Sequence, residues 1–255
     1  MGKHMTTNNH FKIIVPSYNN EKWLHACLKS VLLQTYDNYQ CIIVDDCSTD
    51  SSSEIIEREI DKNSKFMFIK NSERKLALRN IYEAIEYSNP DNEDVIITLD
   101  GDDWFATKNV LEILNNKYKE TDSWMTYGSY MEYPSRNRGK FSREIPKEII
   151  ESNTFRESEW MSSHMRTFKY KLWKRIEKKD FLEEDGRFCD GAWDMIFMFP
   201  MLEMAGHRST FIKDVLYSYN RINPLNEDKV DHQNLYRSEA KIRRKAKYER
   251  ITDDI

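Results

Sequence analysis

The chain has 255 residues, of which 39% are hydrophobic and 13% aromatic, and this is enough apolar material for a large folded core. Its 39 Lys and Arg nearly balance its 43 Asp and Glu, and a net charge of -4 excludes a strongly basic nucleic-acid-binding surface. No nucleic acid is therefore expected as a partner. The low content of Gly and Pro and the many aromatic residues exclude a chain that is mainly disordered.

The sequence offers no segment that resembles a membrane span or a leader. Its apolar runs fall far short of the roughly 20 residues that cross a bilayer. Residues 1–10 are polar, lack the apolar stretch of a signal peptide, and begin with what resembles a cloning remnant, so we expect a tag or a disordered start there. The four cysteines show neither a paired nor a zinc-binding spacing. These features together predict a cytoplasmic protein.

Short apolar runs alternate with helix-period segments up to about residue 100. The runs are rich in Ile and Val and end at polar residues, which is typical of strands buried on both faces. They cover residues 11–15, 41–44, 66–69 and 95–99. Helical periodicity is found around residues 23–32, 55–60 and 76–85. This alternation predicts an α/β fold with a mostly parallel central sheet and helices on both of its faces.

The pattern is less regular after residue 103. Further helices are predicted over residues 108–118, 170–176, 193–205 and 235–251, and strands over residues 124–127 and 211–219. The segment between residues 128 and 143 is predicted to form irregular strands and a loop. Because the chain contains no linker, repeat or low-complexity tract, we expect a single domain over residues 11–255.

An acidic cluster, Asp100-Gly101-Asp102-Asp103, follows one of the predicted strands directly. Three neighbouring carboxylates repel one another unless a cation or a hydrogen-bond donor compensates them. Ligands of parallel sheets bind beyond the carboxyl ends of the strands. The cluster therefore indicates Mg²⁺ or Mn²⁺ bridging nucleotide phosphates, and Gly101 would let the loop approach a ligand closely. The structural alternative is an Asp-rich turn that caps a helix.

Two further strand ends carry residues that suit a nucleotide. Asp45 and Asp46 follow the second strand, and a carboxylate there can accept hydrogen bonds from a base or a ribose. Pro16 and Tyr18 follow the first strand, and the Tyr ring can lie on a nucleobase. Each motif also fits a plain turn or a surface aromatic residue, so only the set carries weight.

Taken in order and spacing, these motifs resemble the family-2 glycosyltransferases of GT-A fold. The resemblance rests on residues 15–19, 43–50, 78–80 and 99–103, within about the first 105 residues, although Cys47 and Lys75 stand where the family usually has Gly. It implies a nucleotide-sugar-binding half over residues 11–105. The nucleotide pocket would be lined by Pro16, Tyr18, Asp45 or Asp46, Arg79 and Asp100. Asp100 and Asp102 would bind Mn²⁺ or Mg²⁺, with Asp102 as the direct ligand.

The same resemblance implies an acceptor and catalytic half over residues 106–230. Asp194, at the start of the predicted helix 193–205, is the candidate general base, and Asp190 is the second candidate. The alternative for Asp194 is a carboxylate that only stabilises the helix N-terminus. In the implied mechanism the metal neutralises the departing nucleoside diphosphate, and the base deprotonates the attacking acceptor hydroxyl. One direct displacement inverts the anomeric configuration.

Several residues of the second half have less specific predictions. His164 and Arg166 are candidates for contacts with the acceptor or a phosphate, and a structural role remains the alternative for the histidine. Arg221 is predicted to reach the diphosphate, with a plain strand and turn as the alternative. His207 and His232 are candidates for an additional metal ligand.

A basic C-terminal helix is expected over residues 231–255. Its clustered Lys and Arg would suit weak contact with an anionic membrane surface or a nucleic acid. Its apolar face is thin, so a solvated helix docked on the domain is the preferred interpretation.

The sequence therefore predicts a metal-dependent, inverting glycosyltransferase of the hexosyltransferase type. Its expected donor is a nucleotide sugar, with a UDP-sugar preferred, and its expected acceptor is a glycan, a protein or a lipid. Two alternatives remain: a catalytically inactive nucleotide- or glycan-binding member of the same fold, and a nucleotidyltransferase. The second should carry a Gly-rich basic phosphate loop after the first strand, and residues 16–19 do not form one.

Overall fold

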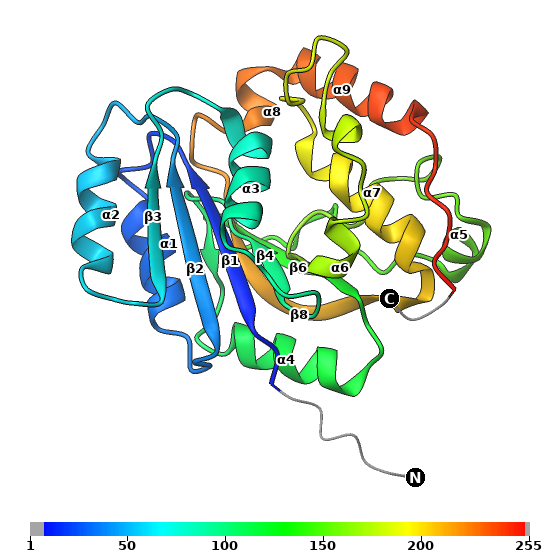
Figure 1. The fold of residues 1–255 in the computed structure, drawn as a ribbon, viewed down its shortest axis with the longest axis horizontal. Helices are drawn as coiled ribbons and strands as arrows, with labels where there is room; N and C mark the ends of the chain where they lie inside the picture. The colour runs from blue at the N-terminus through cyan, green and yellow to red at the C-terminus, as the bar shows by residue number, and fades with distance from the viewer. Residues whose placement is uncertain (1–7, 253–255) are drawn as a thin grey trace.

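The computed structural model describes residues 8–252. A sheet of eight strands in the order β3-β2-β1-β4-β7-β6-β8-β5 runs through it, with helices on both faces (Figure 1). The strands are β1 (Phe11–Ser17), β2 (Tyr39–Asp45), β3 (Phe66–Lys70), β4 (Val95–Thr98), β5 (Trp104–Phe105), β6 (Met125–Tyr133), β7 (Arg166–Lys169) and β8 (Ser209–Asn220). The predicted α/β class is confirmed.

The helices follow the predicted segments closely in the first half and less closely in the second. The longer ones are α1 (Leu24–Leu32), α2 (Ser52–Ile60), α3 (Leu76–Tyr87), α4 (Val110–Glu120), α7 (Trp193–Ala205) and α9 (His232–Arg244). The shorter ones are α5 (Lys147–Ser152), α6 (Tyr170–Trp173) and α8 (Glu227–Val230), with 3₁₀ turns at Lys178–Phe181 and Gly206–Arg208. Among residues 8–252, no helix combines the length and the apolar character that a membrane span needs.

The four strands predicted from the first hundred residues form one parallel block. β1 pairs with β2 and β4, and β2 pairs with β3. Successive side chains of a strand point to opposite faces, so Ile13 packs toward α1 and α4 while Ile14 packs toward α3 and α7. The prediction of burial on both faces is wrong for β3, which is an edge strand with partly exposed residues.

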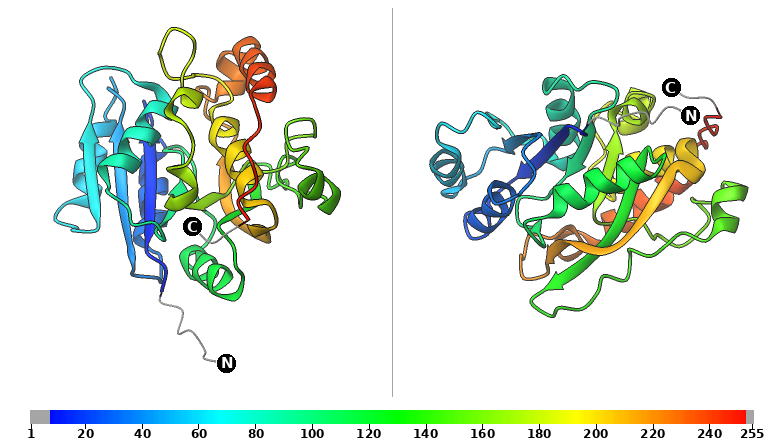
Figure 2. Two further views of the ribbon diagram at one scale, coloured as in Figure 1. Left: turned by 45° about the vertical axis from the view of Figure 1, so that its right-hand side comes forward. Right: turned by 90° about the horizontal axis from the view of Figure 1, so that it is seen from below.

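The second half continues the same sheet with mixed strand directions. β7 is antiparallel to both β4 and β6, whereas β6 is parallel to β8. Figure 2 shows the long strands β6 and β8 side by side, curving away from the parallel block. Helix α7 is apolar around its whole circumference, and every residue from Met195 to Ala205 is buried. A helix of this kind must be covered on all sides, and α3, β6 and α9 are among the elements that pack on α7.

The C-terminal helix ends earlier than predicted. α9 ends at Arg244, and the prediction of a helix to residue 251 is wrong because the following residues form no regular secondary structure and bond to α7 instead. The amide of Tyr248 donates to Glu203 Oε2 over 3.0 Å, and the amide of Ile251 donates to Met204 O over 3.0 Å. Buried Arg156 pairs with Glu203 at 2.5 and 2.9 Å and donates to the Ile242 carbonyl over 2.7 Å. These bonds fix α9 and its extension on the domain.

The expected tag falls partly inside the described chain. Residues 1–7 lie outside the described residues. Asn9 hydrogen-bonds to Asn115, and His10 lies 3.1 Å from Asp94, so both contribute to the fold.

Candidate active site

A cleft of about 1320 Å³ opens at the carboxyl ends of the parallel strands. The ends of β1, β2 and β4 contribute Pro16, Asp46 and Asp100 to its wall, and the start of α7 faces them with Asp194. This is the edge at which α/β sheets bind ligands. The predicted site residues that line the cleft are Pro16, Tyr18, Asp46, Asp100, Asp102, His164, Arg166, Asp190 and Asp194.

One end of the cleft holds Tyr18, Asp46 and Arg74. The guanidinium carbon of Arg74 lies 3.3 Å from the centre of the Tyr18 ring, and its Nε donates to Asp46 Oδ2 over 3.0 Å. Asp46 also accepts from the amides of Lys75 and Leu76 at 2.8 and 2.9 Å. Burial alone would raise the pKa of Asp46, but hydrogen bonding by the side chains of Asn80 and Asn71 and by the two amides outweighs burial and holds the pKa below its usual value. This carboxylate is therefore ionised and fixed in place.

Three predicted nucleotide residues do not line the cleft. Asp45 is fully buried, and its carboxylate accepts from the hydroxyls of Ser48 and Ser53, so it holds the turn that leads into α2. Arg79 lies on α3 and pairs with Glu83 four residues later at 2.7 Å. Arg221 pairs with Asp228 at 2.9 Å. Of the pair Asp45 and Asp46, only the second faces the cleft.

The acidic loop 100–103 packs tightly against the end of β1. A Cβ atom on Gly101 would lie 2.8 Å from the Cβ atom of Ser17 and 3.0 Å from the side-chain nitrogen of Asn20. Only glycine fits so close an approach. The close contact seen here is with the side chains of Ser17 and Asn20. That Gly101 lets the loop approach a ligand stays a prediction.

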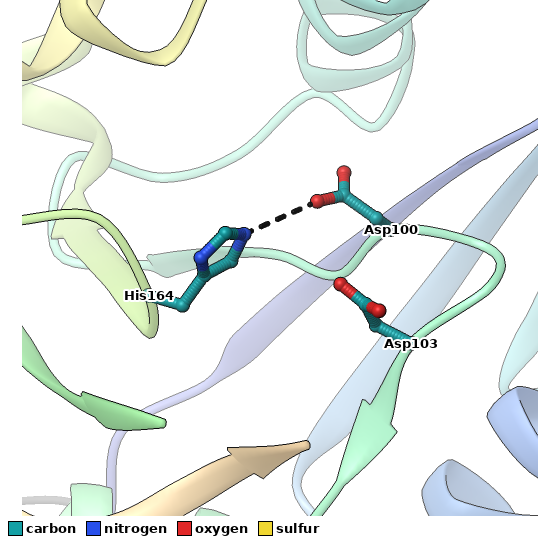
Figure 3. A group of neighbouring side chains, drawn as sticks. All are labelled: Asp100, Asp103 and His164. Atoms are coloured by element: carbon teal, nitrogen blue, oxygen red, sulfur yellow. Dashed lines mark hydrogen bonds and ion pairs between the residues drawn. The ribbon is translucent and has the colours of Figure 1, made fainter. Parts of the chain in front are cut away.

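Asp100 lies at the centre of a polar network. Its Oδ2 atom is 3.2 Å from Arg166 Nη2, 3.4 Å from His164 Nε2 and 3.3 Å from the Tyr217 hydroxyl. Figure 3 shows His164 and Asp100 pointing toward one another, with Asp103 beside them. Burial would raise the pKa of Asp100, but the His164 contact and the Arg166 charge outweigh it and lower the pKa. Burial and the Arg166 charge also lower the pKa of His164, so its ring is neutral near pH 7.

The other two acids of the loop have different surroundings. Asp103 is fully buried and accepts from the Tyr217 hydroxyl and the Asn220 amide, both at 2.7 Å, so it ties the loop to β8. Asp102 faces the cleft and accepts from the side chain of Asn223 at 2.7 Å. Burial and the Asp100 charge raise the pKa of Asp102 to about 6. An added cation would therefore favour the ionised form of Asp102.

Arg166 connects the acidic loop to the start of α7. Its side chain is 1% exposed, and its Nη1 lies 3.1 Å from Asp194 Oδ2 while its Nη2 contacts Asp100. The guanidinium carbon also lies 4.7 Å from the Trp193 ring centre. A single buried cation thus contacts both the candidate base and a candidate metal ligand.

The turn before α7 is held from outside by α8 and α9. The Asp190 carboxylate accepts from Asn234 at 2.9 Å, and the Ala192 amide donates to Glu227 Oε1 at 2.9 Å. A Cβ atom on Gly191 would lie 2.6 Å from the Ser238 hydroxyl, so this residue also contacts α9 directly. Burial and the charges of Asp194 and Asp190 raise the pKa of Glu227 to about 8.

The donor set of this centre fits a hard divalent cation. Ligand atoms of Asp100, Asp103 and His164 lie within 4.8 Å of one another. Asp102 is outside this group and lines the same cleft. Carboxylate oxygens are the ligands that Mg²⁺ and Mn²⁺ prefer. Of the candidate histidines, His164 adjoins the acids, whereas His207 and His232 do not line the cleft.

Three residues of the cleft were not predicted as site residues from the sequence: Arg74, Asn223 and Glu227. Arg74 follows β3 in the loop at the same sheet edge as the other strand ends, so the argument that located Asp46 would also have located it. Asn223 and Glu227 follow the irregular end of β8, and no local pattern distinguishes them from ordinary turn residues.

The sheet and the residues that line its cleft indicate the class of protein to which this chain belongs. The fold and the acidic cleft are those of a GT-A glycosyltransferase. Residues 12–182 match "Glycosyl transferase family 2", and the chain belongs to this family. Membership of this family sets aside the nucleotidyltransferase alternative, and the named relatives support a glycosyltransferase enzyme.

Similar proteins include glycosyltransferases of several bacteria. Glycosyltransferase GlyG of Streptococcus pneumoniae serotype 4 is 28% identical over 223 residues, which are 82% of this chain and 70% of GlyG. An uncharacterized glycosyltransferase of Haemophilus influenzae is 38% identical over 120 residues, 46% of each chain. Other relatives are much longer: the matching part is 24% of glycosyltransferase RC0461 of Rickettsia conorii and 26% of GlyA of Streptococcus pneumoniae.

Solved structures share the fold at low sequence identity. TarS of S. aureus matches with a TM-score of 0.68 at 18% identity, over 91% of this chain and 39% of TarS. TarS 1–349 in complex with UDP-GlcNAc matches with a TM-score of 0.66 at 17% identity, over 91% of this chain and 66% of that one. Mannosyltransferase PcManGT of Pyrobaculum calidifontis, in complex with GDP-Man and Mn²⁺, matches with a TM-score of 0.57 at 18% identity, over 84% of this chain and 57% of that one.

Proposed function

We propose that this glycosyltransferase is metal-dependent and transfers the sugar of a UDP-sugar to an acceptor hydroxyl with inversion, with Asp194 as the general base. The observation that carries the proposal is the bridge made by Arg166. Because this residue contacts both Asp100 and Asp194, the acidic loop and the candidate base face one space. The similar TarS and PcManGT were solved with UDP-GlcNAc and with GDP-Man and Mn²⁺, which supports a nucleotide-sugar donor here.

The nucleoside is proposed to bind at the Tyr18 end of the cleft. The ionised Asp46 offers a fixed acceptor for a base N–H or a ribose hydroxyl, and Tyr18 offers an aromatic face. Arg74 covers one face of this ring, and its side chain is 39% exposed. A base that stacks on the same face therefore displaces Arg74, which would leave its guanidinium beside the nucleotide.

The diphosphate is proposed to lie over the acidic loop. Asp102 and Asp100 would hold Mn²⁺ or Mg²⁺, which when bound neutralises the charge that develops on the leaving diphosphate. Asn223 orients the Asp102 carboxylate through its 2.7 Å hydrogen bond, and Arg166 keeps Asp100 ionised. His164, neutral beside Asp100, can donate to that carboxylate without adding positive charge.

The proton of the acceptor hydroxyl is proposed to pass to Asp194. Each oxygen of this carboxylate accepts one hydrogen bond, Oδ2 from Arg166 at 3.1 Å and Oδ1 from the Met195 amide at 2.9 Å. A carboxylate oxygen has a second lone pair, so a hydroxyl can still donate to it. The two existing bonds fix the orientation of the carboxylate toward the cleft.

Two measurements test the proposal. Calorimetry with UDP, GDP and CDP, with and without Mn²⁺, should show metal-dependent binding of UDP; if none of them binds, the donor site is wrongly assigned. Asp194→Asn should then keep UDP affinity and lower turnover of the preferred donor by at least about a hundredfold, the scale of general-base catalysis. Asp190→Asn is the matched control, and a loss confined to this control would move the base to Asp190.

A further inference from the structure

One wall of the cleft is positively charged. The segment 134–143 contains Arg136, Arg138, Lys140 and Arg143 and no Asp or Glu. The last three of these cations line the cleft. The donor and base sites described above use none of them, so this charge has no role in the proposed function as it stands.

The wall is held firmly beside the reaction centre. A Cβ atom on Gly139 would lie 1.9 Å from the Tyr130 ring, so the backbone at Gly139 lies directly against this ring. The Gly139 amide also donates to the Tyr130 carbonyl over 2.9 Å. The Ser142 hydroxyl donates to the His164 carbonyl over 2.6 Å. His164 in turn adjoins Asp100, so these contacts hold the backbone of the segment next to the acidic loop.

The charges of the wall are poorly compensated within the protein. Arg138 donates to the Ser129 hydroxyl over 2.8 Å and to the Lys213 carbonyl, and both acceptors are neutral. The Lys140 ammonium lies 4.6 Å from the centre of the Phe141 ring. Arg143 pairs with Glu159, but the two side chains are 53% and 79% exposed, and such pairs contribute little.

Acids from the turn before α7 and from α8 and α9 also line the cleft, and these acids have partners. Asp190 accepts from Asn234, and Asp231 caps α9 through the Asn234 amide. Asp228 and Glu239 pair with the guanidinium groups of Arg221 and Arg243. These acids are compensated within the protein, whereas the cations of the segment 134–143 are left to attract an anion that enters the cleft.

We propose that the acceptor is a glycan or polyol chain that carries phosphate or carboxylate groups, and that the segment 134–143 holds an anionic group of this chain near the reacting hydroxyl. This inference rests on the proposed function, because it assigns the acceptor of the same site. Guanidinium groups bind phosphate and carboxylate through paired hydrogen bonds, which suits Arg138 and Arg143. The nucleotide residues Tyr18 and Asp46 follow β1 and β2, whereas this segment follows β6, so different parts of the chain would hold the two ligands.

The test uses three labelled probes of similar length: oligogalacturonate for carboxylates, short inorganic polyphosphate for phosphates, and a neutral malto-oligosaccharide. Binding to the full chain is followed by fluorescence anisotropy at two salt concentrations. The test variant is Lys140→Glu with Arg143→Glu. The matched control is Lys29→Glu with Lys62→Glu, which reverses the same number of exposed charges away from the cleft. UDP affinity is measured on every preparation.

We expect at least one anionic probe to bind about tenfold more tightly than the neutral probe, and we expect its binding to weaken as the salt concentration rises. The test variant should lose at least about tenfold of this affinity, while the control variant and the UDP affinity change little. Comparison of the two anionic probes identifies phosphate or carboxylate as the preferred group. Three outcomes would overturn the inference. The neutral probe could bind as tightly as the anionic probes, both variants could lose the same affinity for the anionic probe, or the test variant could lose UDP affinity to the same degree. Absence of UDP binding by the unchanged protein would instead contradict the proposed function.

Discussion

The buried cation of the cleft provides a sharp test of the electrostatics. Arg166 is 1% exposed and lies 3.2 Å from Asp100 and 3.1 Å from Asp194. Arg166→Met keeps much of the length of the side chain and removes its charge. Because removal of one partner leaves buried carboxylates uncompensated, we expect the free energy of unfolding to fall by about 3–5 kcal/mol near neutral pH.

The loss should depend on pH in a defined direction. Asp100 has a lowered pKa in the folded protein, so its ionised form contributes stability above its unfolded pKa of about 4. This contribution to stability is lost as the pH falls through the folded pKa. Without Arg166, burial dominates and raises the folded pKa of Asp100. The variant then loses stability as pH rises through this higher pKa. Its deficit against the wild type should therefore be large at about pH 7.5 and much smaller at about pH 5.

Urea unfolding at both pH values, followed by tryptophan fluorescence in buffer with a chelator, measures this difference. Arg143→Met is the control, because Arg143 belongs to an exposed pair and its loss should cost less than about 1 kcal/mol at either pH. An equal deficit of the Arg166 variant at both pH values, or a deficit below about 1 kcal/mol, would refute the reasoning.

Three further predictions concern the neighbours of this cation. Asp102→Ala should weaken Mn²⁺-dependent UDP binding at least about tenfold in calorimetry, and wild-type affinity would remove Asp102 from the metal site. Gly101→Ala should lower the free energy of unfolding by about 1–3 kcal/mol, since the new Cβ atom would lie 2.8 Å from that of Ser17; unchanged urea unfolding would contradict this close approach. Glu227 has a raised pKa of about 8, so ionising it costs stability as pH rises from its unfolded value through about 8. Glu227→Gln should therefore be more stable than the wild type at about pH 9, by on the order of 2 kcal/mol, with little difference at about pH 5; equal urea midpoints at about pH 9 would contradict the burial argument.

The first half of the fold was predictable because its signals are local. The apolar runs of β1, β2 and β4 are short, and each ends at a polar residue. Parallel pairing then requires their carboxyl ends to meet at one edge, which places Asp46 and Asp100 in the same cleft without any knowledge of side-chain packing. Helix α7 was also predicted with its observed bounds, because an apolar segment of this length bounded by Gly191 and Gly206 fits a buried helix.

The choice between neighbouring residues was not predictable in the same way. Asp45 and Asp46 are adjacent, and only their contacts decide which one faces the cleft: Ser48 and Ser53 capture the first, and loop amides capture the second. Arg79 has its partner Glu83 one helical turn away. A partner of this kind is visible in the sequence at four-residue spacing, so the pairing could have argued against a role for Arg79 in the cleft.

The position of the candidate base depends on contacts that are distant in sequence. Ala192 has a φ of 49°, a left-handed conformation that costs a residue with a Cβ atom about 1–3 kcal/mol. Two hydrogen bonds with residues 35 and 44 positions further along the chain offset this cost: the Ala192 amide donates to Glu227, and the Asn234 side chain donates to Asp190. Since α8 and α9 supply these bonds, the last part of the described chain helps to determine where Asp194 points. The orientation of Asp194 therefore could not be predicted from residues 193–194 alone, because residues distant in the sequence stabilise the turn that precedes α7.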